Sequence, residues 1–237
     1  MSSNLKVTVK MDGSTLEKLQ KRNYLLFAFR AVETNAEGGM PVVWFSTTGY
    51  SELTDVSWQE TYGAFASQTE VKSGTQIAAS CFKEINLNQK MEVVAPLQCK
   101  DPVSGIAGCI AVLNSRDSEL PSCGISEKNQ AGEFAPLCAF PLFGGNMIML
   151  KPIQKVFLMF ANKPIVTKTV IAQSVGPGLL IDLTNKQERT ISYDVNKNWI
   201  WDPKEGYAEA YAAGSDLAPR LIIPSEGLKM ASMNLLI

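Results

Sequence analysis

Apolar and polar residues alternate along much of this chain, which indicates β-strands. Leu5, Val7 and Val9 are apolar and the residues between them are polar, the period of two that a half-buried strand shows. Similar short runs recur between turn-forming residues as far as the C-terminus. We expect strands at residues 5–10, 24–32, 41–46, 56–67, 77–87, 91–97, 106–113, 137–143, 147–150, 156–160, 165–174, 179–183, 190–195, 199–201, 221–223 and 233–237.

Two segments predict a helix and one predicts a loop. Ser14 and Glu17 have the spacing of a capping box, so we expect a helix over residues 15–22. The alanine-rich segment 207–213 predicts a second short helix. Residues 114–136 contain proline, glycine, serine and charges with little periodicity. They are expected to form a long loop, and long loops inside compact domains are often functional.

The chain is therefore expected to be all-β and mainly antiparallel, with one or two short helices. Short strands separated by frequent turns are typical of a β-sandwich, and two packed β lobes also fit a chain of 237 residues. We expect a single domain over residues 1–237. The apolar segments 42–45 and 157–160 are similar and lie about 115 residues apart. They leave open a pseudo-repeat with halves at about 1–115 and 116–237.

The composition of the chain limits the kinds of partner that we expect. The chain is 46% hydrophobic and 19% charged, which is ordinary for a globular protein. Its 22 basic and 23 acidic residues give a formal net charge of −1. We expect no nucleic-acid partner, because such binding needs a basic footprint. No uncharged apolar run of about 18 residues is present, so a transmembrane protein is not expected either.

The chain contains no histidine. This absence removes Ser-His-Asp and Cys-His activation of a nucleophile, and it removes histidine-ligated metals. Carboxylates, lysine, tyrosine and cysteine can still be tuned for catalysis. An enzyme of unknown reaction that depends on a carboxylate or a cysteine therefore stays open, but the sequence favours binding over catalysis.

Five cysteines stand 10 to 18 residues apart without a CxxC motif, so a zinc site is not expected. Residues 1–4 show no secretory signal pattern. We therefore expect reduced thiols and a cytoplasmic location, or release without a signal peptide. Cys81 and Cys109 are expected in the core. Cys99 and Cys123 lie near predicted loops and are the pair expected to join in an oxidising medium.

Tryptophan and tyrosine gather in two parts of the chain. Trp58 and Tyr62 would share one face if residues 56–67 formed a continuous strand. Aromatic faces with amides and carboxylates nearby suit a sugar or a membrane interface, whereas a sandwich core would also use such residues. The ligand-binding candidates are Trp44, Tyr50, Trp58, Tyr62, Trp199, Trp201 and Tyr207.

Residues 194–205 have the oxygen pattern of a calcium loop. Asp194, Asn196, Asn198, Asp202 and Glu205 occupy positions 1, 3, 5, 9 and 12 of a twelve-residue loop. The position that requires glycine for a sharp turn holds a tryptophan instead. A β-hairpin with asparagines at its tip explains the segment better. Calcium is the only cofactor that the sequence suggests.

We expect a non-enzymatic β-sandwich protein, lectin-like or lipid-binding, that recognises a carbohydrate or a membrane lipid headgroup. A toxin-like version would also form homo-oligomers and act on membranes. The alternative is a self-assembling structural or storage protein of the inclusion type, which a net charge close to zero favours.

Overall fold

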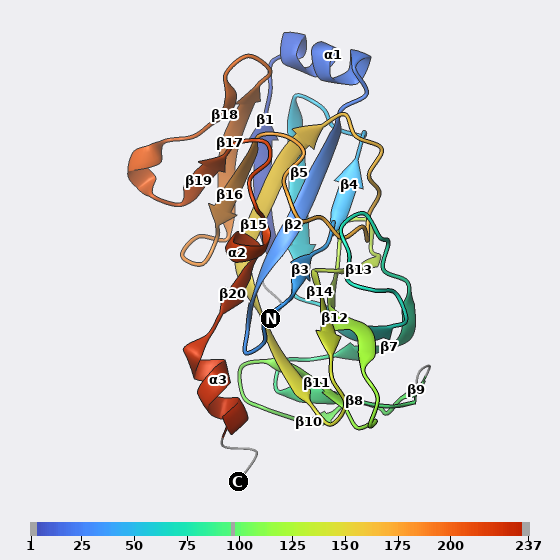
Figure 1. Cartoon of the computed structure of the whole chain (residues 1–237). Helices are drawn as coiled ribbons and strands as arrows, with labels where there is room; N and C mark the ends of the chain where they lie inside the picture. The colour runs from blue at the N-terminus through green and yellow to red at the C-terminus, as the bar shows by residue number, and fades with distance from the viewer. Residues whose placement is uncertain (1–3, 96–97, 234–237) are drawn as a thin grey trace.

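The structure is a computed structural model that describes residues 4–95 and 98–233, and it is mostly β (Figure 1). The predicted all-β class is confirmed, and most strand pairs are antiparallel. Three sheets form two lobes, called upper and lower from their places in Figure 1. Helices are short: α1 (Gly13–Lys21), the 3-10 helix η1 (Pro203–Glu205), α2 (Ala218–Leu221) and α3 (Glu226–Met233).

Each sheet has its own set of strands. Sheet 1 contains β18 (Asn198–Ile200), β17 (Glu188–Asp194), β1 (Asn4–Lys10) and β5 (Leu53–Gln59). Sheet 2 contains β10 (Val103–Ser104), β8 (Gln89–Ala95), β9 (Gln98–Cys99), β11 (Ile110–Asn114), β15 (Met147–Ala161), β16 (Gly178–Asp182), β19 (Ala208–Tyr211), β2 (Leu25–Thr34), β4 (Phe45–Thr47) and β20 (Ile222–Pro224). Sheet 3 contains β3 (Met40–Pro41), β14 (Cys138–Leu142), β12 (Leu120–Lys128), β13 (Phe134–Pro136), β6 (Tyr62–Ser67) and β7 (Ala79–Ile85).

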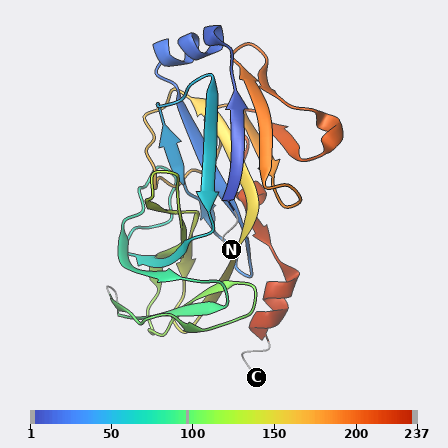
Figure 2. The ribbon, with the colours of Figure 1, turned by 180° about the vertical axis from the view of Figure 1, so that it is seen from behind.

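The long strands β15 and β2 run through both lobes, side by side in both views (Figures 1 and 2). The first part of β15 pairs with β11 in the lower lobe, and its second part pairs with β16 in the upper lobe. Its pairing with β2 shifts register between Pro152 and Val156. A proline has no N–H for the ladder, so a bulge is the natural place for it. One strand thus contributes to both lobes.

The core lies between the sheets. In the upper lobe, sheet 1 packs on β2, β15 and β16, and Figure 2 shows β1 and β5 in front of them. Val7 and Ile191 of sheet 1 share one core cluster with Leu158 and Phe160 of β15. In the lower lobe, apolar residues of β12 join the same cluster from sheet 3. The core is therefore continuous from one lobe to the other.

A buried ion pair lies where the lobes meet. Arg30 on β2 donates from Nε to Glu127 Oε2 on β12 at 2.8 Å, and the two side chains are 1% and 0% exposed. Arg30 also donates to the Lys155 carbonyl at 2.8 Å, beside the bulge of β15. Its guanidinium lies 4.2 Å above the ring of Trp58 on β5. One side chain therefore contacts all three sheets.

The surroundings of Glu127 are unusual for a carboxylate. Burial raises its pKa, and the Arg30 charge offsets that effect only in part. Its Oε1 has no hydrogen-bond partner among the described residues, whereas its main-chain carbonyl accepts a bond from Trp44 Nε1 at 3.0 Å. The carboxylate depends on Arg30 for its stability inside the protein.

Three local predictions are wrong. α1 begins after Asp12, whose carboxylate accepts from the Thr15 N–H at 2.6 Å, so the predicted capping box at Ser14 is not used. The expected helix 207–213 is strand β19, because pairing with β16 overrides the helix propensity of alanine. Residues 114–136, expected as a loop, contain β12, the strand that carries Glu127. Ser122 is buried because β12 lies inside a sheet, and its hydroxyl donates to the Thr69 carbonyl at 2.6 Å.

Other predicted strands differ in extent. Segment 56–67 is two strands in different sheets, since β5 ends at Gln59 and β6 begins at Tyr62. Residues 147–160 form the single strand β15 despite Pro152. Segment 165–174 makes isolated bridges only. The predicted strand 233–237 begins at the end of α3, and residues 234–237 lie outside the described residues.

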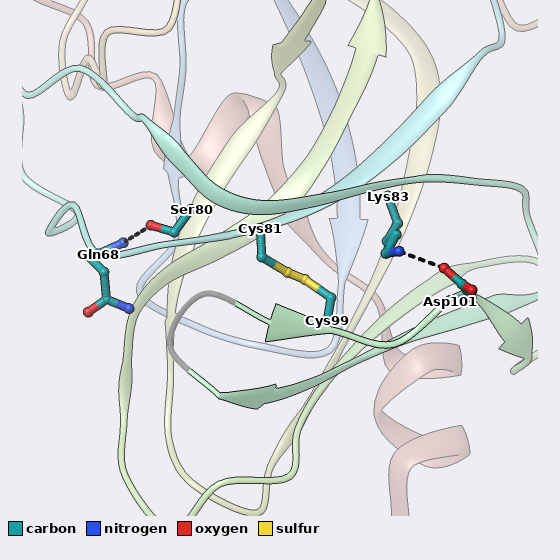
Figure 3. Close-up of a disulfide and its surroundings, with 6 residues drawn as sticks. All are labelled: Gln68, Ser80, Cys81, Lys83, Cys99 and Asp101. Atoms are coloured by element: carbon teal, nitrogen blue, oxygen red, sulfur yellow. Dashed lines mark hydrogen bonds and ion pairs between the residues drawn. A yellow bond between two sulfur atoms is a disulfide. The ribbon is translucent and has the colours of Figure 1, made fainter.

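A disulfide connects Cys81 on β7 with Cys99 on β9, with Cα atoms 6.0 Å apart (Figure 3). It ties sheet 3 to sheet 2, and the Lys83–Asp101 ion pair lies beside it at 2.6 Å. The predicted Cys99–Cys123 pairing and the placement of Cys81 as a free core thiol are therefore wrong. Cys123 lies inside β12, away from any loop.

The remaining thiols are buried. Cys109, Cys123 and Cys138 carry no disulfide. Burial raises the pKa of Cys109 and of Cys123, and it raises the pKa of Cys138 to about 12. Thiolate is the reactive form, so these cysteines are expected to be inert in the folded protein.

We expect a thiol titration to follow this arrangement. The folded protein should react negligibly with a thiol reagent such as dithionitrobenzoate, the unfolded protein should show three thiols, and the reduced unfolded protein five. The unfolded Cys81→Ser/Cys99→Ser variant should show three thiols both before and after reduction. Five thiols in the unreduced unfolded protein purified under oxidising conditions would contradict the disulfide.

We also expect a substitution in the buried ion pair to lower the free energy of unfolding far more than a substitution in a surface pair. Arg30→Met should lower the free energy of unfolding by about 3–5 kcal/mol, because it leaves a buried carboxylate unpaired. The double variant Arg30→Met/Glu127→Leu should recover much of that loss. Urea unfolding measures both.

The control is the exposed pair Lys151–Glu33, whose side chains are 46% and 29% exposed. Lys151→Met should cost less than about 1 kcal/mol. A loss in Arg30→Met as small as that control would show that the pair does not hold the lobes together.

Candidate functional site

The predicted aromatic ligand residues lie mostly in the core. Trp201 is half-buried. The other six side chains are less than 9% exposed: Trp44, Tyr50, Trp58, Tyr62, Trp199 and Tyr207. A flat aromatic platform open to solvent is therefore not formed by these six rings.

The structure brings the two aromatic groups together inside the upper lobe. Phe160 of β15 lies between them, with Tyr50 edge-on at 5.3 Å and Trp199 stacked at 5.6 Å. Trp44 and Trp58 meet separately at 5.7 Å. Tyr62 lies near Glu127, and burial together with that carboxylate raises its pKa. The rings serve the packing of the sandwich, which is the alternative that the sequence left open.

The predicted calcium ligands do not converge. Asp194 accepts from the N–H groups of Asn196 and Lys197 and so closes the hairpin between β17 and β18. Asp202 caps η1 by accepting from the Lys204 N–H at 2.9 Å. Glu205 pairs with Arg189. The described residues contain no group of three or more acidic or cysteine side chains able to hold a metal ion. The segment is the predicted hairpin, with Asn198 at a positive φ of 63°.

A polar groove lies beside this hairpin, where a strand of sheet 1 ends early. β18 ends at Ile200, opposite Ser192, so the first half of β17 has no described strand on that side. The chain turns away into η1, which projects from the upper lobe in Figures 1 and 2, and returns at Tyr207. Tyr207 donates to the Thr190 carbonyl at 3.4 Å. The space left along β17 has a volume of about 410 Å³.

Charged side chains line this space, here called the charged groove. Lys6 pairs with Glu188 at 3.5 Å, and Arg189 with Glu205 at 3.4 Å. No ion pair joins Lys186 to another described residue. The threonines of β1 and β17 complete the floor. The lining is Lys6, Thr8, Lys186, Glu188, Arg189, Thr190, Glu205 and Tyr207.

Arg189 is held by stacking more than by hydrogen bonds. Its guanidinium lies 4.2 Å above the ring of Tyr207, and its side chain is 13% exposed. Its Nε has no acceptor among the described residues. Burial and the nearby Glu205 raise the pKa of Tyr207, so its phenol stays neutral at physiological pH. The groove combines a fixed cation, a neutral phenol and exposed carboxylates.

The sequence identified only two of these residues, Tyr207 and Glu205. Lys6 and Lys186 stand about 180 positions apart in the chain and meet because β1 and β17 pair in parallel, Lys6 opposite Glu188. No local pattern signals a parallel pairing of distant strands. The charge alternation in Lys186-Gln187-Glu188-Arg189 is visible in the sequence, but it is ordinary for a solvated strand end.

Comparisons of this chain with protein-family models, with curated proteins and with solved structures give no match. Within the described residues, no helix has both the length and the apolar character needed to span a bilayer. The function must therefore be argued from the groove itself.

We expect calcium to leave the protein unchanged, because Asp194 and Asp202 already accept bonds in turns and Glu205 pairs with Arg189. At 5 mM calcium, a site with a dissociation constant of about 50 µM would stabilise the fold by about 2.7 kcal/mol. Thermal unfolding with calcium and with a chelator should instead coincide. A calcium-specific rise in the midpoint that Asp194→Asn removes would overturn this prediction.

Proposed function

We propose that the protein is a non-enzymatic binding protein, and that the charged groove binds a polyhydroxylated ligand bearing an acidic group. Such chemistry occurs in acidic carbohydrates and in the headgroups of inositol-type or sugar-bearing lipids. The observation that carries the proposal is the lining of the groove, where three cations, two carboxylates and a phenol face a space of about 410 Å³.

The arrangement of donors and acceptors supports a polyol. Arg189 and the lysines supply charge-assisted donors, while Glu188 and Glu205 accept bonds from hydroxyls. A sugar needs both kinds of partner in one site, because each hydroxyl donates and accepts. A lipid tail would leave these charges without partners, which is costly.

The charge balance supports an acidic group on the ligand. Two of the three cations are paired with carboxylates across the groove, at 3.5 and 3.4 Å. Lys186 is exposed and has no such partner among the described residues. A carboxylate, sulfate or phosphate on the ligand would complete its ion pair.

We expect two variants to weaken binding. Lys186→Gln removes the unpaired cation, and Arg189→Gln removes the stacked one, so each should raise the dissociation constant about tenfold, or about 1.4 kcal/mol. The probes are a sulfated oligosaccharide, a uronate oligosaccharide and phosphatidylcholine vesicles with and without phosphatidylinositol phosphate. Calorimetry and vesicle sedimentation measure binding, which should weaken as salt rises.

Lys72→Gln is the matched control, because Lys72 is exposed and lies outside the groove. Binding of a free oligosaccharide identifies a carbohydrate, and binding of charged vesicles alone identifies a lipid headgroup. Wild-type protein that binds none of the probes would overturn the proposal. Equal affinity in wild type, Lys186→Gln and Arg189→Gln would remove the groove as the site.

A further inference from the structure

A second hollow lies on the outer face of sheet 3, and its lining residues differ from those of the charged groove. Its floor includes Ser126 of β12 and Pro136 of β13, which lie opposite each other, and Gly63 of β6 lies opposite Ser126 on the other side. A Cβ atom at Gly63 would come within 2.3 Å of the Phe82 ring. The absence of a side chain at Gly63 therefore lets that ring lie flat across β6 and form one wall.

The walls are apolar and aromatic. Phe82 and Phe134 pack with their ring centroids 4.9 Å apart, and Phe82 is 37% exposed. The space between these rings and the segment 77–79 has a volume of about 230 Å³. We call it the apolar groove, and the lining residues that matter are Ala79, Phe82, Ser126, Phe134, Pro136 and Lys168.

Two polar groups in the apolar groove lack partners. Ser126 is 3% exposed, and no hydrogen bond joins its hydroxyl to another described residue. Lys168 lines the same groove, and its ammonium makes no ion pair within the described part of the chain. A nearly buried hydroxyl and a cation without an ion pair that line one apolar hollow suit a ligand with an acidic end.

The backbone holds Lys168 in place. Its φ is +74°, in the left-handed region that residues with a Cβ rarely adopt. Its N–H donates to the Val43 carbonyl at 2.8 Å, and its carbonyl accepts from the Ile77 N–H at 2.9 Å. The main chain at Lys168 is thus fixed on both sides, so the side chain starts from a defined position beside the groove.

We propose that the apolar groove binds a small carboxylic acid with an aromatic ring or a short aliphatic chain. The ring would lie against Phe82 and Phe134, and the carboxylate would accept from Ser126 and pair with Lys168. The volume of about 230 Å³ is below the range of drug-sized sites, so it suits a molecule of about ten non-hydrogen atoms. The positive charge of Lys128, 5.0 Å from the Phe134 ring, also favours an anion.

The experiment uses phenylacetate and its neutral isostere phenylacetamide. NMR titration of the full chain should show phenylacetate binding with a dissociation constant of the order of 1 mM, usual for so small a ligand. Lys168→Asn removes the charge and keeps a residue that tolerates the left-handed backbone. It should weaken phenylacetate about tenfold and leave phenylacetamide unchanged.

Two further variants test the position of the site. Ser126→Val fills the floor and should weaken both probes, whereas Lys163→Asn, an exposed lysine outside the groove, should change neither. Lys168→Asn alone decides the outcome if Ser126→Val fails to fold. No phenylacetate binding at about 10 mM, or an equal effect of Lys168→Asn on both probes, would overturn the proposal.

Discussion

The ion pair between Arg30 and Glu127 is the interaction on which the arrangement of the three sheets depends. Both charges are almost completely excluded from water. Removing charges from water costs several kcal/mol per ion, so neither residue is tolerated unless the other is in position. Because Arg30 also contacts Lys155 and the Trp58 ring, the requirement fixes β2, β5, β12 and β15 relative to one another.

The bulge of β15 lies beside this ion pair. Its pairing with β2 shifts register between Pro152 and Val156, and the carbonyl of Lys155 points to Arg30 there. The strand can then pair with β11 in one lobe and with β16 in the other. The two lobes therefore share a strand, a core cluster and an ion pair. They are parts of one structure joined at its centre.

Both proposed ligand sites lie on outer surfaces, away from this centre. The charged groove exists because β18 is shorter than β17, and the apolar groove exists because Gly63 and Ser126 are small. Their ligand-binding charges come from lysine and arginine. The chain has no histidine, the side chain whose ordinary pKa lies between pH 5 and 8.

The sequence by itself determined the class of the fold, because the alternation of apolar and polar residues follows from the strand period and needs no distant partner. It also determined the hairpin at residues 196–198, where asparagines suit a tight turn. The ligand set Asp194, Asn196, Asn198, Asp202 and Glu205 followed the same local pattern, but Asp194 and Asp202 cap turns and Glu205 pairs with Arg189. The local pattern therefore predicted the turn but not a metal site.

Only the tertiary structure decided which residues meet. It placed Trp44, Trp58 and Trp199 in the core, turned part of the expected loop 114–136 into the strand that carries Glu127, and paired Cys81 with Cys99. It also paired Lys6 with Glu188 and placed Lys168 and Ser126 in the lining of one groove. Each of these outcomes depends on segments that are distant in sequence. Pairing between distant strands depends on how the whole sheet assembles.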